Sequence, residues 1–182
     1  MTSIKYMVVS MDNCTFDEAT KGVQFAEVMK GVQKNSEVVI LDFLEIPAFL
    51  PDYKNIQHFF QMCERMGKNP RLPEQRQKFN DLFLEKSGKK YLIGRYGEDR
   101  RAMLLGTDLA KEGRTLHLGI DLFSNQCNAV HSPHAGEIVS TGYDSHGYGY
   151  YIIIKHIIGG FVWYSFFGHM SKNLPSLKKV LI

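Results

Sequence analysis

The most constraining feature of this sequence is a pair of β-forming runs, Tyr151–Ile158 and Phe161–Phe167, separated only by Gly159-Gly160. A two-residue hairpin turn needs positive φ angles, which glycine adopts without a steric cost. The pattern therefore predicts an antiparallel hairpin. Glu137–Thr141, which follows Gly136, predicts a further strand nearby.

The residues before position 90 indicate a mixed, mostly helical region. Helices are expected over Asn55–Met66 and from Pro73 to about Lys86, where proline suits the first helical position. Glu37–Leu44 is apolar and β-branched, which predicts a strand. Thr15–Glu18 matches a helix-capping box. Apolar residues follow this box at helical spacing: Ala19, Val23, Ala26 and Met29.

The expected fold class is α+β. A mixed N-terminal region of unknown role (1–90) precedes an antiparallel β domain (91–182). The formal net charge is only +3 and the charges are interspersed, which argues against a nucleic-acid partner. The cysteines, Cys14, Cys63 and Cys127, lie too far apart for a disulfide framework or a cysteine zinc site. No signal peptide or membrane span is recognisable, so a cytoplasmic location is the default expectation.

The sharpest chemical pattern is His117-Leu118-Gly119-Ile120-Asp121. In an extended chain His117, Gly119 and Asp121 share one face. Leu118, Ile120 and Leu122 share the other face, which could cover a core. Imidazole and carboxylate are ordinary zinc ligands. Because four residues of straight strand span roughly 13 Å, a shared metal ion requires a bend or places Asp121 just past the strand end. The alternative is a surface strand with two polar residues.

Two further segments are candidates for the site. His169 ends the aromatic strand and, by alternation, shares a face with Trp163, Ser165 and Phe167. It could donate a hydrogen bond to a developing oxyanion, or be a plain residue at the sheet rim. The charged run at 98–101 could face the site, but a solvated charge cluster is the favoured interpretation. His131, His134, His146 and His156 are interpreted as surface or structural residues.

Several motifs in order resemble the lysostaphin/LytM-type zinc metalloendopeptidases. The pentapeptide at 117–121 resembles their H-x-G-x-D motif. Four later segments resemble family motifs in the same order: Asn128–Pro133, Ala135–Val139, Gly147–His156 and Phe166–Ser171. The resemblance covers about residues 91–182 and implies a LytM-like domain of duplicated-hybrid-motif fold.

The resemblance implies that His117 and Asp121 bind zinc and that His169 is a catalytic histidine. It also implies hydrolysis of peptide bonds, with the peptide cross-links of peptidoglycan as the substrate and partner. The family takes its third zinc ligand and a second catalytic histidine from an H-x-H motif. No such motif follows His169 before Ile182, so the domain is expected to be truncated and its zinc affinity and activity weak. One alternative is a non-catalytic LytM-like module that binds wall peptides or regulates another hydrolase. The other is a cytosolic small-molecule or protein-interaction domain unrelated to the cell wall.

Overall fold

The computed structural model describes residues 2–7, 16–30, 32, 35–42, 44–45, 47–69, 72–124, 128–145, 147–174 and 179–180. The chain forms two compact units. The first is residues 34–127 with Met1, and the second combines residues 2–33 with 128–182. The boundary expected at residue 90 falls inside the first unit. Helices and a largely antiparallel set of strands confirm the α+β class. No helix in the described ranges is long and apolar enough to cross a membrane.

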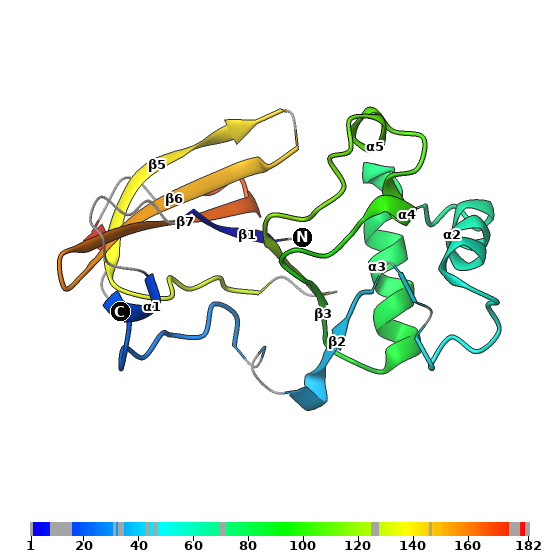
Figure 1. Ribbon diagram of the computed structural model, residues 1–182, viewed down its shortest axis with the longest axis horizontal. Coiled ribbons are helices and arrows are strands. Elements are labelled where there is room, and N and C mark those ends of the chain that lie inside the picture. The colour runs from blue at the N-terminus through cyan, green and yellow to red at the C-terminus, as the bar shows by residue number, and fades with distance from the viewer. Residues whose placement is uncertain are drawn as a thin grey trace. The chain divides into compact units, whose positions relative to one another are not determined.

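The first unit places helices beside a small mixed sheet. β2 pairs with β3 in parallel, and β3 pairs with β4 in antiparallel fashion. Figure 1 shows α3 alongside β3, which it contacts. The elements are η1 (Asn35–Glu37), β2 (Val38–Ile40), α2 (Ile56–Arg65), α3 (Pro73–Ser87), β3 (Tyr91–Gly94), α4 (Arg101–Leu104), α5 (Asp108–Lys111) and β4 (Ile120–Phe123).

Local signals fix the two longer helices, and both predictions are confirmed. The Asn55 side chain accepts a hydrogen bond from the His58 backbone N–H and caps α2. Pro73 opens α3, and Gly88, with a φ of 64°, ends it in the left-handed conformation. The predicted inner face of α2 is buried: Ile56, Phe59, Phe60 and Cys63.

Aromatic side chains dominate the core of the first unit. Phe59 packs against Phe79 and Phe83, with ring centroids 5.7 Å and 6.1 Å apart. Leu92 and Phe123 contribute from β3 and β4. This core anchors the two strands whose ends carry the candidate site. The strand predicted over 37–44 is shorter than expected, since β2 covers only Val38–Ile40.

The second unit contains the predicted hairpin. β6 (Gly149–Ile158) and β7 (Phe161–Met170) pair in antiparallel fashion, and Gly159 and Gly160 have φ angles of 56° and 88°. β7 also pairs with β1 (Thr2–Met7), and β6 pairs with β5 (Gly136–Asp144). β5 in turn pairs with β8 (Lys179–Val180). All these pairs are antiparallel, as predicted for residues 91–182. The pairing of β1 with β7 was not predicted.

The helix predicted from the capping box is wrong in length. α1 covers only Phe16–Ala19, and a turn at Thr20–Gly22 follows. Gly22 has a φ of 80°, which a continuing right-handed helix does not accommodate. The next residues bond to the segment before β5 instead: the Ala26 N–H donates to the Pro133 carbonyl, and the Val28 carbonyl accepts from the His131 N–H, each at 2.8 Å. Tertiary pairing therefore overrides the helical spacing.

Candidate metal centre

His117 and Asp121 lie together in the first unit. His117 Nε2 is 3.5 Å from Asp121 Oδ1, and the two side chains are 7% and 2% exposed. Asp121 is the second residue of β4 and pairs with Gly94 of β3, so it does not lie past the strand end. His117 precedes the strand, which begins at Ile120. The two side chains therefore meet because His117 approaches from outside the strand.

Backbone hydrogen bonds to the segment after β3 hold His117 in place. The Gly97 N–H donates to the His117 carbonyl at 2.7 Å, and the His117 N–H donates to the Glu98 carbonyl at 3.0 Å. The Arg100 N–H donates to the Thr115 carbonyl at 2.8 Å. The expectation of an apolar face on a core is wrong for Leu118, which is 61% exposed, and confirmed for Leu122, which is buried. In this stretch the polar side chains face inward and Leu118 faces solvent.

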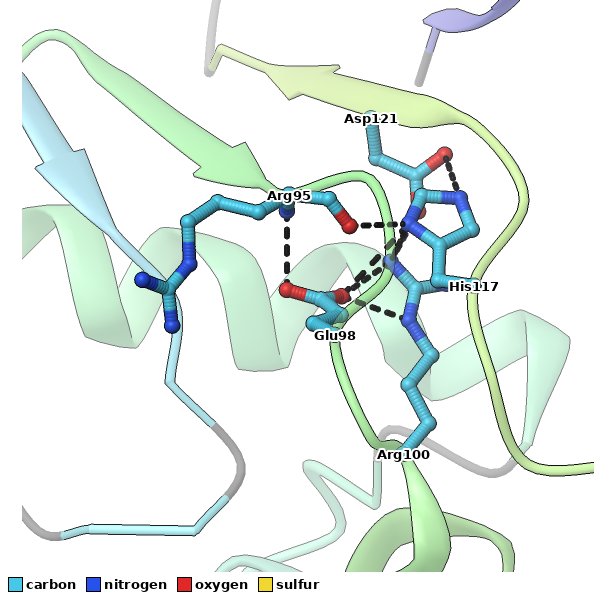
Figure 2. A network of polar contacts seen from close by, with 5 residues as sticks. All are labelled: Arg95, Glu98, Arg100, His117 and Asp121. Carbon is cyan, nitrogen blue, oxygen red and sulfur yellow. Dashed lines mark hydrogen bonds and ion pairs between the residues drawn. The ribbon is translucent and has the colours of Figure 1, made fainter.

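The other imidazole nitrogen of His117 contacts a backbone carbonyl. Nδ1 lies 2.9 Å from the Arg95 carbonyl oxygen (Figure 2). Metal-binding histidines characteristically donate their second N–H to a carbonyl or carboxylate, which fixes the ring and leaves the first nitrogen as a ligand. The Arg95 side chain points away from this ring in Figure 2 and pairs with Asp42 at 2.8 Å.

Glu98 and Arg100 complete the cluster, and the interpretation of residues 98–101 as a solvated cluster is wrong for these two. Arg100 Nη2 lies 2.6 Å from Asp121 Oδ2 and 2.9 Å from His117 Nδ1, while Arg100 Nε donates to Glu98 Oε1 at 2.6 Å. The Glu98 and Arg100 side chains are 3% and 15% exposed. Asp99 and Arg101 form a solvated ion pair at 3.1 Å, as expected.

The charges of this cluster act strongly on one another because the groups are buried. Burial alone would raise the pKa of the Asp121 carboxyl, but hydrogen bonding to His117 and the positive charge of Arg100 outweigh it and hold that pKa below its usual range. Arg76, on α3, interacts electrostatically with both Asp121 and Arg100. Burial lowers the pKa of Arg76, the negative charge of Asp121 raises it, and the positive charge of Arg100 lowers it. Asp121 is therefore an anion at neutral pH.

The His117–Asp121 pair fits two ligands of one zinc ion. Two atoms bonded to one tetrahedral zinc ion at about 2.0–2.2 Å lie roughly 3.3–3.6 Å apart. The observed separation of 3.5 Å falls in this range. A catalytic zinc ion usually has three protein ligands. Within the described part of the chain, no group of three histidine, cysteine, aspartate or glutamate side chains could hold a metal ion.

His169 belongs to the second unit, near the end of β7. Its φ of 56° is the one left-handed value found for a non-glycine residue in the described ranges. The β6–β7 register shifts between Tyr150 and Ile152, which pair with Met170 and Phe167. This β-bulge interrupts the alternation that was expected to place His169 on the face of Trp163, Ser165 and Phe167. The His169 N–H donates to the Tyr148 carbonyl at 2.6 Å.

The remaining histidines of the second unit are packed differently. His156 is fully buried, stacks on Trp163 and has Nε2 2.8 Å from Ser165 Oγ. Burial lowers its pKa, so the ring is neutral at pH 7. His134 Nδ1 lies 3.1 Å from the Ala135 carbonyl, and His131 is exposed. His146 lies outside the described residues.

The sequence interpretation missed the roles of Glu98, Arg100 and Arg76. One local signal was present for the first two, because Glu98 and Arg100 are two residues apart and share a face in extended chain. No comparable signal existed for Arg76, which reaches the cluster only through the packing of α3 beside β3.

Residues 115–180 match the model of peptidase family M23. The matched segment contains His117, Asp121 and His169 but not Glu98 or Arg100. No curated protein and no solved structure matches the chain. The resemblance to LytM-type peptidases is therefore confirmed for this segment.

Proposed function

Because residues 115–180 match the model of peptidase family M23, we propose that the chain is a zinc-dependent endopeptidase with a LytM-like domain of duplicated-hybrid-motif fold. Its proposed substrate is the peptide cross-link of peptidoglycan. The observation that carries the proposal is the 3.5 Å separation of His117 Nε2 and Asp121 Oδ1. This separation suits two ligands of one zinc ion. Both side chains are buried, and the Arg95 carbonyl oxygen fixes the orientation of the His117 ring.

Each residue has a distinct proposed role. His117 and Asp121 would hold the zinc ion, with the imidazole oriented by the Arg95 carbonyl. When bound, zinc supplies a Lewis acid that polarises a carbonyl and makes water nucleophilic at neutral pH. His169 would donate a hydrogen bond to the oxygen of the scissile carbonyl, where negative charge develops. The hydrogen bond from its backbone N–H to the Tyr148 carbonyl and the bulge hold the backbone of His169 in place, which supports this role.

A second candidate is a non-catalytic LytM-like module that binds wall peptides or regulates another hydrolase. The observation that favours it is the ligand set: the described residues gather two zinc ligands, whereas three are usual in a catalytic centre. Such a module would use the same fold to bind a cross-linked peptide without cleaving it. Its binding would not depend on metal.

The decisive experiment combines metal analysis with a digestion assay on the full chain. The purified protein is assayed for bound zinc and incubated with purified peptidoglycan, and the released peptides are identified by mass spectrometry. We expect slow release, because the described residues gather two zinc ligands rather than the usual three. The new peptide termini should disappear with a chelator and return with added zinc. Substitutions H117A, D121N and H169A should each abolish release, whereas H131A, at an exposed histidine, should leave it unchanged.

Two results would contradict the endopeptidase proposal. One is a metal-free protein that stays inert with added zinc. The other is release that persists in H117A, which would point to a contaminating hydrolase. Cosedimentation with peptidoglycan that is unaffected by a chelator, with no release of peptides, would select the non-catalytic module instead.

A further inference from the structure

His117 Nδ1 lies within hydrogen-bond distance of two groups that demand opposite protonation states. It lies 2.9 Å from the Arg95 carbonyl oxygen, which can only accept a hydrogen bond. It also lies 2.9 Å from Arg100 Nη2, which can only donate one. A single ring nitrogen cannot satisfy both at once. The Arg95 carbonyl therefore stabilises the tautomer with a proton on Nδ1, and Arg100 stabilises the tautomer without it.

The tautomer decides what the other nitrogen can do. With the proton on Nδ1, Nε2 presents a lone pair towards Asp121 Oδ1 and can be a metal ligand. With Nδ1 accepting from Arg100, Nε2 carries the proton and faces the carboxylate as a donor. Arg100 thus favours the state of His117 that does not bind metal.

Arg100 also neutralises the negative charge of the Asp121 carboxylate. Its Nη2 lies 2.6 Å from Asp121 Oδ2, so a positive charge already compensates this buried anion when no metal is present. A divalent ion held by the same carboxylate would lie close to the guanidinium. In a buried site with little water the repulsion between these cations is strong. Glu98, bonded to Arg100 Nε at 2.6 Å, offsets part of that positive charge.

We propose that Arg100 is a resident cation that competes with zinc for the His117–Asp121 pair, and that Glu98 moderates this competition. The inference rests on the proposed zinc site. A competing role and an orienting role for Arg100 predict opposite changes in zinc affinity when Arg100 is replaced. An orienting residue strengthens zinc binding, so its loss weakens binding. A competing cation weakens zinc binding, so its loss strengthens binding.

The test measures zinc affinity of the full chain by competition with a chromophoric chelator. R100Q should bind zinc about tenfold more tightly or better, because a full positive charge beside the ion is removed. E98Q should bind zinc several-fold more weakly, because the charge of Arg100 loses its partner. R101Q removes a charge from the solvated pair with Asp99 and should leave the affinity unchanged.

Two other readouts separate the charge effect from general damage. Without metal, R100Q should have a lower thermal midpoint than the wild type, since Asp121 and Glu98 lose their buried counter-charge. With histidine labelled by nitrogen-15, R100Q should shift His117 towards the tautomer protonated on Nδ1. If R100Q does not fold, the zinc affinity of E98Q still tests the proposal. Zinc binding by E98Q that is as tight as or tighter than that of the wild type overturns it.

The outcomes distinguish this inference from the zinc site on which it rests. Zinc bound by the wild type and bound equally or more weakly by R100Q overturns the competition but keeps the site. Zinc bound by neither protein overturns both. Tighter binding by R100Q, including binding that is absent in the wild type, supports both.

Discussion

Gly94 leaves the space that Arg100 occupies. A Cβ atom placed on Gly94 would lie 2.7 Å from Arg100 Nη2, 3.2 Å from Glu98 Oε1 and 3.3 Å from Asp121 Cβ. The guanidinium could move aside only by giving up its hydrogen bonds to Asp121 and Glu98. G94A should therefore lower the free energy of unfolding by about 1–3 kcal/mol, the usual cost of overpacking a buried site. Urea denaturation measures this change.

The matched control for G94A is the same substitution in an R100Q background. Because the closest clash is with Arg100, the two substitutions should be strongly non-additive, and G94A should cost less in R100Q than in the wild type. Equal costs in the two backgrounds would contradict the close approach of Arg100 to Gly94.

His169 has a left-handed backbone, which costs an L-residue with a side chain roughly 1–2 kcal/mol. Such strain is found at functional sites, where the surrounding structure holds it in place. H169G removes the strain and H169A keeps it. H169G should therefore be the more stable of the two by about 1 kcal/mol in thermal unfolding, although neither should release peptides from peptidoglycan.

The comparison at His169 has an internal control at His131, which is exposed and has no positive φ. At position 131 the alanine variant should be more stable than the glycine variant, because glycine adds conformational entropy to the unfolded chain and relieves no strain. If H169A proves as stable as H169G, the left-handed conformation of His169 does not store strain.

Much of the fold could be predicted because its determinants are local. The caps of α2 and α3 lie within a few residues of the helix ends, and Gly159-Gly160 alone specifies the β6–β7 turn. The helix expected over residues 15–29 failed because its competitor is distant in sequence: the backbone around Ala26 bonds to Pro133. Helical spacing does not report such a partner.

The candidate site likewise has residues that the sequence predicts and residues that it does not. His117 and Asp121 could be found because they lie four residues apart in a recognisable motif. Their contact with Arg100 depends on the antiparallel bridge between Asp99 and Leu116, which joins segments separated by two short helices. Charged residues at such positions are usually solvated, so sequence alone favoured the wrong interpretation of Glu98 and Arg100.

The buried His156 should make stability depend on acid pH. Burial lowers its pKa in the folded protein, with the nearby His134 acting in the same direction, while the unfolded chain titrates near pH 6.5. The unfolded state therefore binds more protons below that pH. The stabilisation is fully present above about pH 6.5 and is lost as the pH falls below it. Chemical denaturation from pH 7.5 to pH 5 should show this loss, and H156Q should reduce its slope. A slope equal to that of the wild type would sink the assignment to His156.

Ser165 supplies the hydrogen bond that His156 needs when neutral. Its Oγ lies 2.8 Å from His156 Nε2, and the Ala135 carbonyl lies 3.0 Å from Nδ1, so a neutral ring with its proton on Nδ1 satisfies both contacts. S165A removes the donor and leaves Nε2 buried without this partner. The free energy of unfolding should fall by about 1–3 kcal/mol, the usual cost of an unsatisfied buried polar group. S171A, at an exposed serine a few residues later, should change it by less than about 0.5 kcal/mol. Equal effects of the two substitutions would show that the buried bond to Ser165 contributes little to folding.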